Sequence, residues 1–128
     1  MTPAEVLEAY GDAWARDDPE AAWSFYDDDV VMRVPGRGVL AGTHVGKEAV
    51  VDTIRALLAR TSDSSVDLTV VDRLVSDDRV AMIVTERVTR GDTELTFRRV
   101  GVYQVRDGRI IDIDLFDANQ YEVDEFFG

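Results

Sequence analysis

The residues with the clearest potential for chemistry lie in the stretch 109–117, where carboxylates alternate with aliphatic side chains. This alternation predicts a β-strand that carries Asp112 and Asp114 on one face. A carboxylate that faces an apolar cavity is poorly hydrated, which raises its pKa and suits it to general acid or base catalysis. Asp114 is therefore the candidate proton carrier. The plainer alternative is that this strand face is solvated.

Three further side chains are candidates for catalysis beside Asp114. Arg87, in a predicted neighbouring strand, could neutralise Asp114 or bind an oxyanion, although a structural ion pair would use the same residues. His44, in a loop before a helix, could donate a proton near neutral pH, although such a histidine is more often a surface residue. Tyr10 could direct a hydroxyl into a cavity, but its helical position also suits the core.

Other residues are expected to contact a ligand. Tyr26 could contribute a second hydroxyl. Arg98 and Arg99 lie on opposite faces of one predicted strand, which places Arg99 on the side of Arg87. The apolar lining, or simply the core, would come from large side chains, namely Trp14, Trp23, Met32, Phe97, Tyr103 and Phe116. Val34 is also expected to contact the ligand.

The elements that must position these residues form two groups. Helices are predicted from Pro3, from Pro19 and over residues 46–60, because apolar residues recur there at helical spacing. Period-two alternation then predicts strands, namely 30–34, 66–75, 80–89, 93–105 and 109–117. Asp117 is predicted to cap a short terminal helix, and Asp27–Asp29 to form a loop. This order favours an α+β fold, in which helices pack on one side of a curved antiparallel sheet and leave a conical cavity.

The same alternation leaves an aliphatic row on the other face of the last strand, formed by Ile111, Ile113 and Leu115. A contiguous apolar surface is seldom left in contact with water. We therefore expect these residues to form the interface of a homodimer through the outer face of the sheet.

Composition limits the remaining possibilities. A chain of 128 residues fits a single domain over 1–128. It has no cysteine and one histidine, which excludes disulfides, zinc–thiolate sites and multi-histidine metal sites within the chain. The net charge of −12 argues against nucleic acid and anionic membranes as partners. Since neither a leader nor a membrane-spanning stretch is visible, a cytoplasmic location is expected.

Four segments resemble the SnoaL-like branch of the nuclear-transport-factor-2-like superfamily, namely 10–18, 25–31, 40–49 and 101–127. The resemblance implies a cone-shaped, cystatin-like fold with a central cavity. It also invites comparison with ketosteroid isomerases, in which a tyrosine and two acids act on the substrate. Tyr10 matches the tyrosine, whereas Val34 and Gly101 stand in place of the acids.

Limonene-epoxide hydrolases, from the same superfamily, offer a second pattern. Arg87 and Asp114 match its arginine and last-strand aspartate. Thr89 replaces the other aspartate, and Met32 and Val34 stand where that family holds its catalytic water. The resemblance thus implies an apolar, oxygenated ligand, such as a terpenoid, steroid-like or polyketide-like molecule. The expected chemistry is cofactor-free proton transfer of isomerase, cyclase or epoxide-hydrolase type. The alternative is a non-catalytic ligand-binding or dimeric assembly module.

Overall fold

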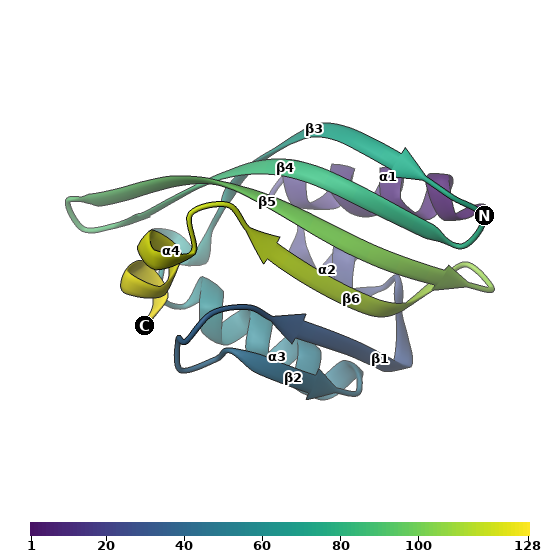
Figure 1. Ribbon diagram of the computed structural model, residues 1–128, viewed down its shortest axis with the longest axis horizontal. Coiled ribbons are helices and arrows are strands. Elements are labelled where there is room, and N and C mark those ends of the chain that lie inside the picture. The colour runs from purple at the N-terminus through teal and green to yellow at the C-terminus, as the bar shows by residue number, and fades with distance from the viewer.

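A six-stranded sheet forms one layer of the molecule, and three helices lie behind it (Figure 1). The computed structural model describes residues 1–128. The covering helices are α1 (Pro3–Ala15), α2 (Pro19–Trp23) and α3 (Lys47–Leu58). The strands are β1 (Tyr26–Val34), β2 (Gly42–Val45), β3 (Asp67–Val75), β4 (Arg79–Arg90), β5 (Thr93–Arg106) and β6 (Arg109–Asp117). The 3₁₀ turn η1 (Ser62–Ser64) precedes β3, and α4 (Gln120–Phe127) ends the chain. The predicted α+β fold is confirmed.

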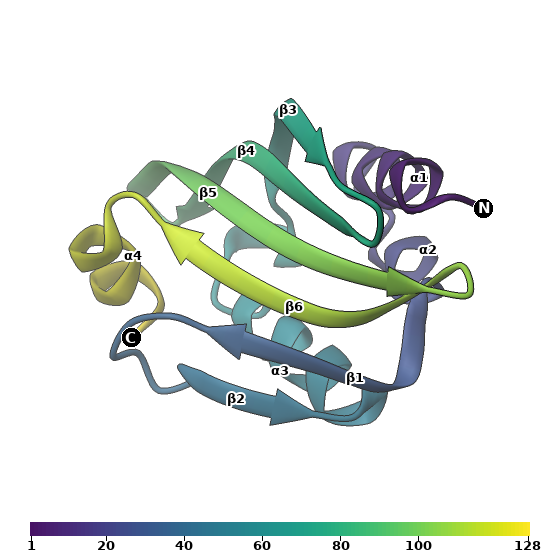
Figure 2. The same ribbon diagram turned by 45° about the vertical axis from the view of Figure 1, so that its right-hand side comes forward.

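The strands follow the order β2-β1-β6-β5-β4-β3, so the last strand of the chain lies in the middle of the sheet. All neighbouring pairs are antiparallel except β1 and β6, which run parallel. This pair corrects the prediction of a wholly antiparallel sheet. It arises because the meander from β3 to β6 returns to β1, which entered the sheet first. Figure 2 shows the sheet curving around the helix layer, with α4 at one end.

The turns and caps follow local chemistry. Thr2 and Glu5 form a reciprocal capping box at the start of α1, with Pro3 in the first turn. Asp107 and Gly108 both have positive φ, as a two-residue hairpin turn requires. The helix predicted from Pro3 is thereby confirmed, and the turn joins the two strands predicted over 93–105 and 109–117.

The last strand contains an irregularity that decides which residues face inward. Gln104 pairs with Asp112 and Val105 pairs with Ile110, so Ile111 is an extra residue without its own partner. Such a β-bulge reverses the alternation of side chains. Ile110 points inward before the bulge, and Ile113 points inward after it.

The core lies between the helices and the inner face of the sheet. Val6 and Leu7 of α1 are fully buried there, as are Tyr26, Val80 and Ile110 from the strands. Burial of these apolar side chains is the main force that holds the two layers together. None of the helices is both long and apolar enough to cross a membrane.

Two local predictions are wrong. Residues 27–29, predicted as a loop, lie within β1, where the register with β6 is irregular. Asp117, predicted to cap the terminal helix, is not its N-cap; Asn119 holds that position. Asp117 instead turns inward as the last residue of β6, for which the bulge at Ile111 is responsible.

Candidate functional site

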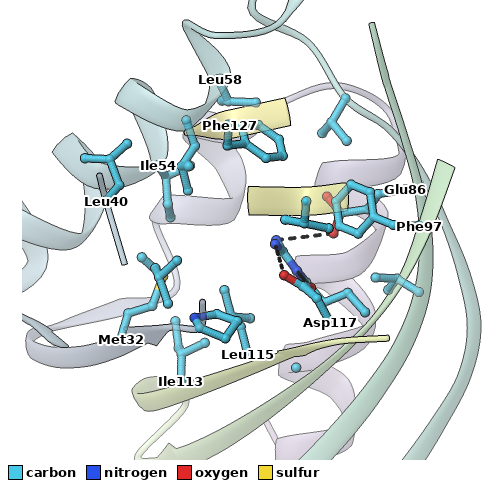
Figure 3. Close-up of a pocket in the computed structure, with 18 of the residues that line it drawn as sticks. Met32, Leu40, Ile54, Leu58, Glu86, Phe97, Ile113, Leu115, Asp117 and Phe127 are labelled. Carbon is cyan, nitrogen blue, oxygen red and sulfur yellow. Dashed lines mark hydrogen bonds and ion pairs between the residues drawn. The ribbon is translucent and has the colours of Figure 1, made fainter. Parts of the chain in front are cut away.

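A cavity of about 120 Å³ lies between the helix layer and the inner face of the sheet. Its wall is mostly hydrophobic, and includes Met32, Ile113 and Leu115 from the sheet and Ile54 from α3 (Figure 3). Val39, in the loop after β1, belongs to the lining and is 66% exposed, so the cavity reaches the surface beside this loop. A wall of this composition favours a small, largely apolar ligand.

Four charged side chains belong to the lining. Asp124 comes from α4, whereas Glu86, Arg99 and Asp117 come from the strands β4, β5 and β6 and interrupt the apolar wall of the sheet. Figure 3 shows Glu86 and Asp117 on one side of the cavity, across from Leu40 and Ile54. We call Glu86, Arg99 and Asp117 the charged cluster. These three residues lie close together because β4, β5 and β6 are adjacent in the sheet and each presents one of them on its inner face.

The two acids of the charged cluster are held differently. Arg99 donates from Nε to Asp117 Oδ1 at 2.6 Å and from Nη2 to Asp117 Oδ2 at 3.1 Å. Glu86 lies farther away, with Oε2 at 3.4 Å from Arg99 Nη1. The Asp117 side chain is 1% exposed and that of Glu86 10%. Arg99 and Asp117 thus form a fixed bidentate pair, and Glu86 is the less constrained acid.

Burial raises the pKa of Glu86 above its ordinary value; the Arg99 charge opposes this effect and the Asp117 charge reinforces it. For Arg99, burial disfavours the charge, but Glu86 and Asp117 more than compensate and raise its pKa. The Arg99 guanidinium also lies over the Phe97 ring, with Cζ 5.1 Å from the ring centroid. The cluster therefore combines a permanent cation with an acid that gains a proton more easily than usual.

A second polar group in the cavity wall consists of phenols. The hydroxyls of Tyr10 and Tyr26 are 2.7 Å apart and share a hydrogen bond. Tyr103 packs edge-on against Tyr10, with ring centroids 5.3 Å apart. Burial is the largest cause of the raised pKa of all three phenols. They therefore remain protonated near neutral pH and can act as hydrogen-bond donors.

The structure places the predicted catalytic residues mostly outside the cavity. The prediction that Asp114 faces the cavity is wrong: it lies on the outer face and pairs with Arg33 Nη1 at 3.0 Å. Arg87 also lies on the outer face and pairs with Asp67 and Glu94. The reason for assigning these two residues a catalytic role is therefore removed.

His44 was predicted to lie in a loop, but it is part of β2, and it does not line the cavity either. Its Nε2 is 2.8 Å from the Leu40 carbonyl oxygen, and its Nδ1 is 3.1 Å from Thr53 Oγ1. His44 therefore connects the loop after β1 to α3. Tyr10 is the one predicted catalytic residue that lies in the cavity wall.

The predicted ligand contacts agree better with the structure. Seven of the residues line the cavity, namely Trp14, Tyr26, Met32, Val34, Phe97, Arg99 and Tyr103, whereas Trp23 does not. Phe116 does not, because it points outward and is 56% exposed. Ile113 and Leu115, predicted for the outer face, line the cavity instead. These errors in β6 share one cause, the bulge at Ile111, which makes residue 113 rather than residue 112 the next inward residue after Ile110. Arg99 and Arg87 lie on opposite faces of the sheet, because Arg99 pairs with Val84, an odd number of residues before Arg87.

Sequence reasoning missed Glu86 and Asp117. Glu86 interrupts a row of apolar residues at every second position of β4, namely Val80, Met82, Val84 and Val88. A single charge within such a row is the signal that would have identified it. Asp117 has the same relation to Ile113 and Leu115 in β6. No group of three or more His, Asp or Glu side chains is arranged to hold a metal ion.

A layered α+β protein with a cavity of this kind can be compared with known proteins. The sequence matches the family model of the SnoaL-like domain over residues 7–113, and the chain belongs to this family. Family membership supports a small-molecule binding or isomerase-type role. A comparison with curated protein sequences gives no significant match.

Solved structures similar to this chain have the same fold. Bal32a, from a soil-derived mobile gene cassette, has a TM-score of 0.89 and 27% identity over 98% of this chain and 96% of its own. A Xanthomonas campestris protein of unknown function with a cystatin-like fold has a TM-score of 0.90 and 25% identity, covering 100% and 99%. TerC, co-crystallised with polyporic acid, has a TM-score of 0.83 and 19% identity, covering 98% of both chains.

Proposed function

We propose that the protein binds a small, mostly apolar, oxygenated molecule in the cavity and transfers a proton through the Glu86 carboxyl group. The observation that carries this proposal is the asymmetry of the charged cluster. Arg99 is fixed by two hydrogen bonds to Asp117, whereas Glu86 makes one longer contact of 3.4 Å. A buried acid with a raised pKa and no short hydrogen bond to its counter-ion suits proton transfer near neutral pH.

The proposed chemistry is of the isomerase type. The Glu86 carboxylate removes a proton from a carbon next to a ligand carbonyl, and the bonding electrons move to the carbonyl oxygen. Arg99 stabilises the negative charge that develops on that oxygen, with its position held by Asp117. Protonated Glu86 then returns the proton to carbon, at the same or a conjugated position, and the charge on oxygen is lost.

Two findings support this proposal without deciding the reaction. The chain belongs to the SnoaL-like family, and TerC, which has the same fold, has been co-crystallised with the small molecule polyporic acid. The cavity wall supplies apolar surface on one side and the charged cluster on the other (Figure 3). A ligand with a hydrocarbon body and one carbonyl group would match both.

The test uses 2-tetralone, a bicyclic ketone, because exchange of its α-hydrogens in deuterated water reports proton transfer without knowledge of the natural substrate. We expect the protein to accelerate this exchange, followed by nuclear magnetic resonance. Glu86→Gln should reduce the acceleration by about 10²-fold or more, the usual contribution of a general acid or base. The matched control is Asp114→Asn, which alters an ion-paired acid on the outer face. Equal acceleration by Glu86→Gln and the wild type would contradict the proposal.

A second candidate function is ligand binding without turnover. It is favoured by the contacts of Arg99 with both acids, because the charged cluster is internally paired without a ligand. In that case, the wild type would bind 2-tetralone but would not accelerate exchange. Binding measured beside the exchange assay therefore separates the two functions.

A further inference from the structure

Gly101 occupies a position on the inner face of β5 where any side chain would collide with Tyr103. A Cβ atom there would lie 2.5 Å from Tyr103 Cε1 and 2.7 Å from its hydroxyl oxygen. These distances are far below ordinary van der Waals contact. The Tyr103 ring therefore lies back along its own strand, over Gly101. This glycine is required for space, since it is not among the glycines with positive φ.

This arrangement directs the Tyr103 hydroxyl toward the charged cluster. Residues 99, 101 and 103 share the inner face of β5, so a ring that covers Gly101 extends toward Arg99. Glu86 and Arg99 both influence the pKa of Tyr103, after the larger effects of burial and Tyr10. Gly101 and Tyr103 both line the cavity.

The other two cavity phenols are engaged with each other. Tyr10 and Tyr26 share a hydrogen bond of 2.7 Å, and Tyr26 is fully buried. Tyr103 also lines the cavity and packs edge-on against Tyr10, while its ring leans along β5 toward Arg99. It is the phenol best placed to donate to a ligand atom beside the charged cluster.

We infer that Tyr103, held in place by the space at Gly101, donates a hydrogen bond to a carbonyl or hydroxyl oxygen of the cavity ligand. The inference rests on the proposed function and extends it, because it assigns the residue that selects an oxygenated ligand over a hydrocarbon. Arg99 and Tyr103 would approach the same ligand oxygen, while Glu86 faces the adjacent carbon. The ligand class is therefore a ring compound that carries an oxygen at the end directed toward β5.

The experiment compares two probes of nearly equal shape, 2-tetralone and the hydrocarbon tetralin, by equilibrium dialysis. Tyr103→Phe should lower the affinity for 2-tetralone by about twofold to tenfold, the effect of one net hydrogen bond. Affinity for tetralin should not change. Gly101→Ala should lower the preference for 2-tetralone in the same way, since it displaces the Tyr103 ring. Tyr121→Phe, the same change at a residue that is 93% exposed, is the control.

Each other outcome has a distinct meaning. An unchanged ratio of the two affinities in Tyr103→Phe overturns the inference. The role of Glu86 is tested independently by the hydrogen-exchange assay. An equal loss of affinity for both probes also overturns it, because a structural role would produce that result. If neither probe binds the wild type, both the cavity ligand and the inference are wrong. A lost preference in Tyr103→Phe with unchanged exchange in Glu86→Gln supports the inference and contradicts the proposed chemistry.

Discussion

Glu86 is the residue whose environment differs most from that of an ordinary surface acid. Burial raises its pKa above the usual 4.5, so the folded protein binds a proton there more tightly than the unfolded chain. Its contribution to the free energy of unfolding is therefore fully present below the unfolded pKa and is lost as the pH rises through the folded pKa. The raised pKa that suits Glu86 to proton transfer therefore lowers the free energy of unfolding near neutral pH.

This argument predicts how Glu86→Gln changes the pH dependence of stability. Glutamine does not titrate, so the unfolding free energy of the wild type minus that of the variant should decrease as the pH rises from about 4 toward neutrality. Urea unfolding of both proteins across this range measures the difference. A difference that stays constant or increases with pH would contradict the raised pKa.

Arg99 is the counter-ion of two buried carboxylates, so its removal should strongly lower the free energy of unfolding. Arg99→Met should lower the free energy of unfolding by about 3–5 kcal/mol, because Asp117 and Glu86 would remain buried without a counter-charge. Arg87→Met is the matched control, since Arg87 makes similar ion pairs on the exposed face. Its removal should cost about 0–1 kcal/mol. Similar losses for both variants in urea unfolding would show that the cluster contributes no more than a surface pair.

At the scale of elements, the mouth of the cavity lies where the loop after β1 meets α4. Asp124 of α4 accepts hydrogen bonds from the Arg37 backbone N–H at 3.2 Å and from Gln120 at 2.9 Å. Gly36 has positive φ, and a Cβ there would collide with the Asp124 carboxylate. Since Val39 and Phe127 beside this contact both line the cavity, Asp124 fastens two parts of the rim together.

We therefore expect Asp124→Ala to loosen the rim. In the variant, 2-tetralone should pass between the free and the bound state about fivefold faster, equivalent to about 1 kcal/mol for the lost hydrogen bonds. The effect on affinity should be smaller. Line broadening in nuclear magnetic resonance measures the exchange rate. Glu125→Ala removes a neighbouring exposed acid of the same helix and should leave the rate unchanged. An unchanged rate in Asp124→Ala would place the entrance elsewhere.

Most helices and strands were predictable, because hydrophobic period and local caps determine them, whereas β2 was not among the predicted strands. The inner face of β4 and β5 was also encoded, since apolar residues mark every second position and Glu86 and Arg99 interrupt these rows. The inner face of β6 was not, because one unpaired residue, Ile111, reverses the alternation. Bulges arise from pairing with neighbouring strands, which a single strand's sequence does not contain. For this reason Asp114 was wrongly predicted to face the cavity, and Asp117 was not recognised as a residue of its wall.

At the scale of the whole molecule, the two faces of the sheet differ. Helices cover the inner face, whereas the outer face carries no helix (Figure 1). Ile83, Val100 and Phe116 are paired across β4, β5 and β6 on that outer face. Phe116 is 56% exposed. The nearby acids Asp112 and Asp114 share Arg33 as a counter-ion, which reduces repulsion between two copies of a chain with net charge −12.

The homodimer predicted from sequence is thus still expected, but through this apolar row in place of Ile113 and Leu115. An exposed aromatic residue at the end of an apolar row can anchor an interface. Phe116→Glu should convert a dimer to a monomer in sedimentation at micromolar concentration, because it would bury two unpaired charges. Val71→Glu, at a residue 52% exposed on the edge strand β3, should leave the dimer intact. A monomeric wild type, or a Phe116→Glu variant that remains dimeric, would exclude this interface.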